Sequence, residues 1–146
     1  MIMPYWDTST LAKFYVSEPD TSLFEAHLAA TGPAVTSTLT RYELFRVAAR
    51  KEAEGFIAAG TAEAIFARFL AEVESAKVTL IPIDQAVEDR FRALVLKLHR
   101  LNPPVVGRTL DCIHIAAAEV GKADEVVATD VGLRKAAAAL GLKLFP

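Results

Sequence analysis

The sequence has 146 residues, of which 53% are hydrophobic, and a formal net charge of −2. This length suits one well-buried domain, so we expect residues 1–146 to form a single unit. The charge gives no overall attraction to nucleic acid, so local cations must hold any polyanionic substrate. The apolar residues form no run near the roughly 20 that cross a bilayer, and we therefore expect a soluble chain with no membrane partner.

Two features of the sequence bear on its location in the cell. The stretch MIMPYWD has neither a basic leader nor an apolar segment of about 7–15 residues, so we expect no secretory signal. Cys112 is the single cysteine, which agrees with a reducing compartment. Both observations favour the cytoplasm.

Short β-like runs alternate with longer helical patterns along the chain. The first half predicts strands at 2–6 and 32–37 and helices at 8–16, 21–30, 38–55 and 61–75, the last two as a hairpin broken around Gly55–Gly60. The second half predicts strands at 77–84, 125–130 and 142–145 and helices at 86–101, 109–121 and 132–141. Strands separated by helices imply parallel crossovers, so the sequence predicts an α/β fold with a central, mainly parallel sheet flanked by helices.

Four acidic residues occur where such a fold brings distant parts of the chain together. Asp7 follows the first predicted strand and Asp130 ends the fourth. Glu43 lies near the start of the helix after the second strand, and Asp111 near the start of the helix before the fourth. Binding sites in parallel sheets form outside the carboxyl ends of the strands. We therefore predict an acidic cluster there, with Asp111 included if its helix also begins at that edge.

Each acid also has an architectural interpretation. Asp7 and Asp130 are suitable N-caps for the helices that follow them. Thr40 and Glu43 have the spacing of a capping box, in which the glutamate bonds the first amide of the helix. Asp111 differs, because it stands in an otherwise apolar helix where an unpaired carboxylate is costly. The sequence leaves both interpretations open for the first three acids and favours a functional one for Asp111.

A cluster of four carboxylates implies a metal ion. Neighbouring carboxylates raise one another's pKa, and a divalent cation removes that cost. Mg²⁺ prefers oxygen ligands and keeps several waters, and Mn²⁺ accepts the same oxygens. Zinc is disfavoured because the lone cysteine and the three scattered histidines show no zinc-ligand spacing. We expect Mg²⁺, with Mn²⁺ as a substitute.

Four segments in this order resemble the PIN-domain nucleases, and among them the VapC-type toxins of bacterial and archaeal toxin–antitoxin pairs. The segments are WDTSTLAKFYVSEP, TSTLTRYELFRVAAR, RTLDCIHIAAA and VVATDVGLRKAAAALGLKLF. The resemblance covers nearly the whole chain and implies the PIN-like α/β/α sandwich. It also implies that the acidic quartet of the family is Asp7, Glu43, Asp111 and Asp130.

The resemblance implies a Mg²⁺-dependent endoribonuclease that serves as the toxin of a type II, VapBC-like pair. Our hypothesis is that a metal-activated water hydrolyses RNA phosphodiester bonds. Asp7 and Asp111 would be the main metal ligands, and Glu43 and Asp130 would complete the site directly or through waters. RNA as the substrate, a cognate antitoxin and a homodimer are implied by the resemblance.

Four further side chains have two interpretations each. Ser9 and Thr129 are either ordinary turn residues or hydroxyls that orient the carboxylates. His114, one helical turn after Asp111, is more typical of a satisfied core histidine than of a site residue. Arg108 either holds a phosphate or pairs with an aspartate.

Three other functions compete with this hypothesis. A phospho-accepting receiver domain needs two adjacent acids after its first strand, and YWDTST offers only Asp7. A non-catalytic PIN interaction module would lack one of the four acids, and all are present. A housekeeping RNA-processing PIN nuclease would use identical chemistry, and a neighbouring antitoxin gene would distinguish it from a toxin.

Overall fold

The structure, a computed structural model that describes residues 2–146, contains five short strands within that range. They are β1 (Pro4–Trp6), β2 (Ala34–Ser37), β3 (Val78–Ile81), β4 (Glu125–Val127) and β5 (Lys143–Phe145). The strands form one sheet in the order β3-β2-β1-β4-β5. Every neighbouring pair is parallel, which confirms the α/β class expected from the alternating pattern.

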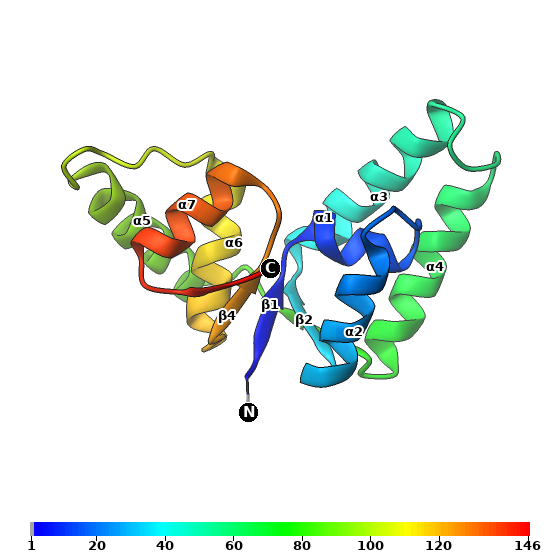
Figure 1. Ribbon diagram of the computed structural model, residues 1–146, viewed down its shortest axis with the longest axis horizontal. Helices are drawn as coiled ribbons and strands as arrows, with labels where there is room; N and C mark the ends of the chain where they lie inside the picture. Colours follow the sequence, from blue (N-terminus) through cyan, green and yellow to red (C-terminus); the bar gives the residue numbers. More distant parts are fainter. Residues whose placement is uncertain (1) are drawn as a thin grey trace.

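Helices cover both faces of this sheet, as parallel crossovers require. The helical segments are α1 (Thr8–Leu11), the 3₁₀ turn η1 (Ala12–Phe14), α2 (Thr21–Thr31), α3 (Leu39–Ala53), α4 (Thr61–Glu74), α5 (Gln85–His99), α6 (Thr109–Val120) and α7 (Val131–Ala139). Figure 1 shows α1 to α4 on one side of the sheet and α5 to α7 on the other. The molecule is therefore the α/β/α sandwich that the sequence predicts.

The core consists of an apolar layer on each face of the sheet. In β1, Tyr5 packs into the layer beneath α5, α6 and α7, whereas Trp6 packs into the layer beneath α2, α3 and α4. In β4, Val126 packs into the same layer as Tyr5, and Val127 packs into the same layer as Trp6. Successive side chains of a strand point to opposite faces, so a central strand covered on both sides is mostly apolar rather than alternating. This explains the short, uninterrupted apolar runs.

Several element boundaries differ from the sequence prediction, beginning with the first strand and the first helix. The first strand begins at Pro4 rather than at residue 2, and a proline is tolerated at the first position of a strand because its missing N–H breaks no interior ladder bond. The helix expected at 8–16 is α1 followed by η1, because the chain must turn back before α2 begins at Thr21. Lys13 stabilises this turn through Glu18 at 2.9 Å and Asp20 at 2.8 Å.

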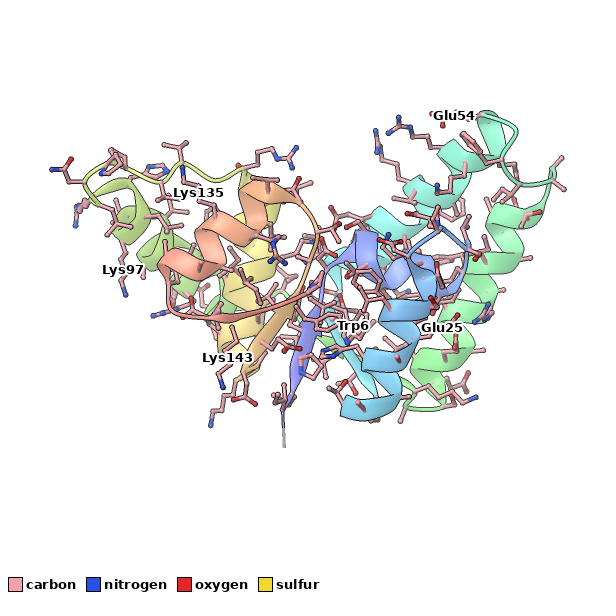
Figure 2. The ribbon with its side chains drawn as sticks, viewed as in Figure 1. Trp6, Glu25, Glu54, Lys97, Lys135 and Lys143 are labelled. Carbon is pink, nitrogen blue, oxygen red and sulfur yellow. The ribbon has the colours of Figure 1, made fainter. Side chains whose placement is uncertain are left out.

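The other strands lie where the sequence predicts them but are shorter, because β2 begins at Ala34 rather than at 32, β3 ends at Ile81 rather than at 84, and β4 ends at Val127 rather than at 130. The remaining helices match the prediction within about two residues. The helical hairpin of α3 and α4 is broken between residues 54 and 60, and Asp84 caps α5 by accepting from the Val87 amide at 3.2 Å. Within residues 2–146, no helix combines the length and apolar character that a membrane span requires. Figure 2 shows Lys97, Lys135 and Lys143 around the α5–α7 side of the molecule.

Candidate active site

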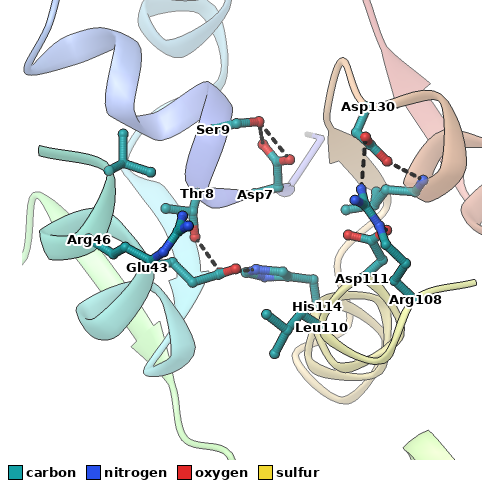
Figure 3. Close-up of a pocket in the computed structure, with 12 residues that line it drawn as sticks. Asp7, Thr8, Ser9, Glu43, Arg46, Arg108, Leu110, Asp111, His114 and Asp130 are labelled. Carbon is teal, nitrogen blue, oxygen red and sulfur yellow. Dashed lines mark hydrogen bonds and ion pairs between the residues drawn. The ribbon is translucent and has the colours of Figure 1, made fainter. Parts of the chain in front are cut away.

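A pocket of about 330 Å³ lies at the carboxyl ends of the central strands. All four acids that the sequence singled out line it: Asp7, Glu43, Asp111 and Asp130. Asp7 directly follows β1, and Asp130 lies between β4 and α7 as the N-cap of α7. Glu43 lies on α3, and Asp111 lies in the first turn of α6 (Figure 3). The first turn of α6 thus lies at this edge, which is the condition for Asp111 to join the others. The topology therefore brings together residues up to 123 positions apart in the sequence.

Asp7 is the most buried of the four acids, with 5% of its surface exposed. It caps α1: Oδ1 accepts from the Thr10 amide at 2.9 Å and from Thr10 Oγ1 at 2.6 Å. Ser9 Oγ donates to Oδ2 at 2.9 Å. Burial raises the pKa of Asp7, and the hydrogen bonds from Thr10 and Ser9 do not offset it. A cation beside this carboxylate would relieve a cost that the hydrogen bonds leave in place.

Asp111 and Asp130 share one cation, the guanidinium of Arg108. Arg108 Nε lies 3.2 Å from Asp111 Oδ2, and Nη2 lies 3.0 Å from Asp130 Oδ1. The second oxygen of Asp130 caps α7 by accepting from the Leu133 amide at 2.9 Å. The arginine is 75% exposed, so water screens these ion pairs. Of the two interpretations of Arg108, the structure shows the one in which it pairs with aspartate.

Glu43 points into the pocket and takes no part in a capping box. Helix α3 begins at Leu39, and Thr40 Oγ1 bonds Thr36 Oγ1 at 2.7 Å instead of the helix backbone. Glu43 Oε1 accepts from Thr8 Oγ1 at 2.8 Å and lies 2.5 Å from His114 Nε2. Burial works to raise the pKa of Glu43, but the contact with His114 and the Thr8 bond outweigh it and lower the pKa. Glu43 is therefore ionised at neutral pH.

The acids share a pocket but do not form a compact ligand set in this structure. No three Asp, Glu, His or Cys side chains in the described part of the chain stand close enough to hold a metal ion. The chemistry of the donors nevertheless fits a hydrated dication. Asp111 Oδ1 and Glu43 Oε2 accept no hydrogen bond from residues 2–146. Mg²⁺ commonly binds one or two carboxylates and keeps several waters, so it does not need three converging side chains.

The structure also places the side chains whose roles the sequence left open. Ser9 contacts Asp7, whereas Thr129 makes no hydrogen bond to any of the four acids. His114 is a buried, hydrogen-bonded histidine, 4% exposed, yet its partner is a pocket acid. Sequence reasoning missed the contacts of Glu43 with Thr8 and His114, and the bridging of two acids by Arg108. The i, i+3 spacing of Arg108 and Asp111 was the only signal for any of these contacts.

The fold and the site together define a class of protein: a parallel α/β/α sandwich with an acidic pocket at the carboxyl edge of its sheet. The PIN domain matches residues 5–139, which is most of the chain. The chain therefore belongs to the PIN-domain family, as its sequence motifs indicated. It is also 34% identical to Ribonuclease VapC47 of Mycobacterium tuberculosis (strain CDC 1551 / Oshkosh) over 120 residues, which are 80% of this chain and 74% of that protein.

Solved structures with the same fold agree with this assignment. One is VapBC2 from Rickettsia felis bound to a DNA fragment from their promoter, with a TM-score of 0.67, 15% identity, and coverage of 99% of this chain and 98% of the other. Another is FitAcB from Neisseria gonorrhoeae, with a TM-score of 0.68, 16% identity, and coverage of 99% and 97%. At these identities the likeness concerns the fold alone. It confirms the sandwich architecture over the full length.

Proposed function

We propose that this protein is a divalent-metal-dependent endoribonuclease and the toxin of a type II toxin–antitoxin pair. The observation that carries the proposal is the convergence of four acids on one pocket in a PIN-domain chain. The relative with 34% identity over most of both chains is named a ribonuclease, which supports RNA as the substrate. The reaction is the hydrolysis of an RNA phosphodiester bond.

Asp7 and Asp111 are the residues that would hold Mg²⁺, or Mn²⁺ in its place. The Asp7 carboxylate is buried with a raised pKa and forms no ion pair with residues 2–146, and Asp111 has an oxygen without a hydrogen bond among the described residues. A bound dication supplies a Lewis acid for a phosphate oxygen and lowers the pKa of water. Glu43 and Asp130 would complete the site directly or through waters.

The protein's own side chains then have distinct tasks at the phosphate. Arg46, on α3, lines the same pocket and makes no ion pair with any residue in the range 2–146. Arg108 faces it from the start of α6 (Figure 3). Arginine binds phosphate through charge-assisted hydrogen bonds, so these two residues would hold the RNA backbone against the repulsion of the acids. The oxygen Oε2 of Glu43, which accepts no hydrogen bond from residues 2–146, would orient a water or accept its proton.

The proposed partners are a cognate antitoxin protein, a second copy of the chain, and cytoplasmic RNA. The resemblance to VapC-type toxins supports the antitoxin, and the fold shared with VapBC2 is consistent with it. A housekeeping RNA-processing nuclease would have the same chemistry. Purification of the tagged chain with the product of a neighbouring short gene would support the toxin. If the chain instead cleaves a precursor RNA and has no such neighbour, it is a processing enzyme.

Cleavage of a defined RNA panel tests the chemistry. We expect cuts with Mg²⁺ or Mn²⁺ and none with EDTA, and a loss of at least about 100-fold in Asp7→Asn and Asp111→Asn. Asp84→Asn is the matched control, because Asp84 caps α5 outside the pocket. Single-stranded DNA of the same sequences tests the preference for RNA.

Two outcomes of this experiment would contradict the proposal. Cleavage that survives EDTA and both pocket substitutions would remove the metal and the acids from the reaction. A folded protein that cleaves no member of the panel, with either metal, would support a non-catalytic PIN module instead.

A further inference from the structure

His114 joins elements that pack on opposite faces of the sheet. It lies on α6, whereas Glu43 lies on α3, and Figure 1 shows these helices on different sides. Its Nε2 is 2.5 Å from Glu43 Oε1, and its Nδ1 is 2.6 Å from the hydroxyl of Tyr5 on β1. The Tyr5 hydroxyl is also 2.9 Å from Ser37 Oγ at the end of β2. A single imidazole thus connects two strands and two helices beneath the pocket.

The protons of this chain of contacts can be assigned from chemistry. A carboxylate only accepts hydrogen bonds, so Nε2 must carry the proton that faces Glu43. Burial raises the pKa of Tyr5, so its hydroxyl keeps its proton. If that proton is directed at Nδ1, the imidazole is neutral. If it is directed at Ser37, Nδ1–H donates to Tyr5 and the ring is charged. In both arrangements Nε2–H donates to Glu43.

The consequence for Glu43 is that its two oxygens become different. Oε1 accepts from both His114 and Thr8, whereas Oε2 accepts from no residue in the described range. The terminal torsion of a glutamate is otherwise broad, so a carboxylate held by one bond would rotate. Two bonds to the same oxygen fix the plane of the carboxylate and leave Oε2 for the pocket. In Figure 3 the His114 ring lies end-on to the Glu43 carboxylate.

We infer that His114 is a positioning residue for the reaction. It holds Glu43, with Tyr5 as its own anchor, so that Oε2 has one orientation toward the substrate. This inference rests on the proposed function, in which Glu43 acts in RNA hydrolysis. His114 would act through Glu43 and not on the phosphate itself.

Three substitutions at His114 separate positioning from simple packing. In His114→Gln the side-chain amide keeps a donor near the Nε2 position, whereas His114→Asn is too short and His114→Leu has no donor. We expect kcat to fall about 10- to 100-fold in the Asn and Leu variants, the range for lost supporting partners of a site, with KM for RNA within about twofold. His114→Gln should recover most of kcat, and Tyr5→Phe should give an intermediate loss.

His27 provides the matched control for a buried histidine–glutamate pair. Its Nε2 lies 2.5 Å from Glu125 Oε1, its side chain is 12% exposed, and neither residue lines the pocket. We expect His27→Asn to lower the melting temperature and leave kcat unchanged. If kcat follows the melting temperature across all these variants, and Gln is no better than Asn at position 114, His114 is only a packing residue and the inference is wrong.

A measurement without turnover separates this inference from the proposed function. In ¹⁵N-labelled protein, His114 should show an Nε2–H signal shifted by its bond to Glu43, and Glu43→Gln should move that signal while the His27 signal stays. An unchanged His114 signal would overturn the inference whether or not the protein cleaves RNA. If the signal moves but the wild-type protein cleaves nothing, the contact exists and the proposed function fails, and with it the role in catalysis.

Discussion

Asp7 offers a test in which stability and activity should change in opposite directions. Its carboxylate is 5% exposed, and its folded-state pKa is raised above the ordinary value of 3.8 because burial outweighs its hydrogen bonds. An asparagine at position 7 removes the buried charge but keeps an oxygen for the two donors of Thr10. Ser9, whose hydroxyl donates and accepts, can bond the amide. We expect Asp7→Asn to be more stable than the wild type without metal.

The sign of the pH dependence follows from linkage. A carboxyl group with a raised folded pKa binds its proton more tightly in the native state than in the unfolded state. The wild type therefore loses stability as the pH rises from about 3.8 through the folded pKa of Asp7. Asparagine does not titrate. The stability advantage of Asp7→Asn should thus be smallest at acid pH and reach its full size at neutral pH.

The Asp7→Ala variant is the matched comparison for Asp7→Asn, and it allows the difference in stability between the two variants to be estimated. Alanine removes the charge and also the N-cap of α1, and loss of an aspartate or asparagine cap costs about 0.5–2 kcal/mol. For a chain of this length that is about 1–8 °C in melting temperature. Asp7→Asn should therefore melt above Asp7→Ala by about this amount at every pH.

Thermal unfolding in EDTA at pH 5, 6.5 and 8 checks these expectations. An Asp7→Asn protein that is less stable than the wild type at pH 8, or whose difference does not depend on pH, would show that the hydrogen bonds already compensate the buried charge. The argument that Asp7 lacks a cation would then fail, and the fit of the pocket to a metal ion would lose its main support.

Two further substitutions address the other wall of the pocket. Arg108→Gln removes the cation shared by Asp111 and Asp130, so Mn²⁺ affinity measured by calorimetry should rise about fivefold at low salt. Because the arginine is exposed, the melting temperature should change by less than about 2 °C. An unchanged Mn²⁺ affinity would show that Arg108 does not compete with the metal. Gly132→Ala places a methyl group 3.3 Å from Asp130 Oδ2 and 3.9 Å from Asp111 Oδ2. A helical Gly→Ala change stabilises by up to about 1 kcal/mol. We therefore expect an equal or higher melting temperature with cleavage reduced about tenfold by the displaced carboxylates, and a parallel loss of stability would contradict this.

The sequence was sufficient to predict which acids line one pocket, because that depends on topology. Alternating strands and helices make the sheet parallel, and a parallel sheet brings its carboxyl ends to one edge. Asp7 and Asp130 follow strands, so their places could be inferred without knowing any side-chain contact. Asp111 required one further condition, that α6 begin at the same edge, and the structure satisfies it.

The partners of these acids could not be predicted in the same way. The contact of Glu43 with His114 joins residues 71 positions apart, and no periodicity in a single sequence encodes such a pair. The capping-box interpretation of Glu43 was wrong because α3 begins one residue before Thr40, whose hydroxyl turns toward Thr36. A local motif was present in the sequence, but tertiary hydrogen bonds determined the conformation.

Capping and participation in the pocket, which the sequence presented as alternatives for two of the acids, prove to be compatible. Asp130 gives Oδ2 to the Leu133 amide and Oδ1 to Arg108, and Asp7 gives Oδ1 to Thr10 while Oδ2 is held only by Ser9. Glu43 follows the same rule, with Oε1 bound to the protein and Oε2 without a partner among residues 2–146. In each case one oxygen fixes the side chain to the protein, while the second faces the pocket with at most one side-chain partner among the described residues. A carboxylate suits this double task because its two oxygens accept independently, and a helix that begins at a strand end supplies the donor for the first of them. The local bonds that look purely architectural are therefore what holds the acids in a fixed geometry at the pocket, as the proposed function requires.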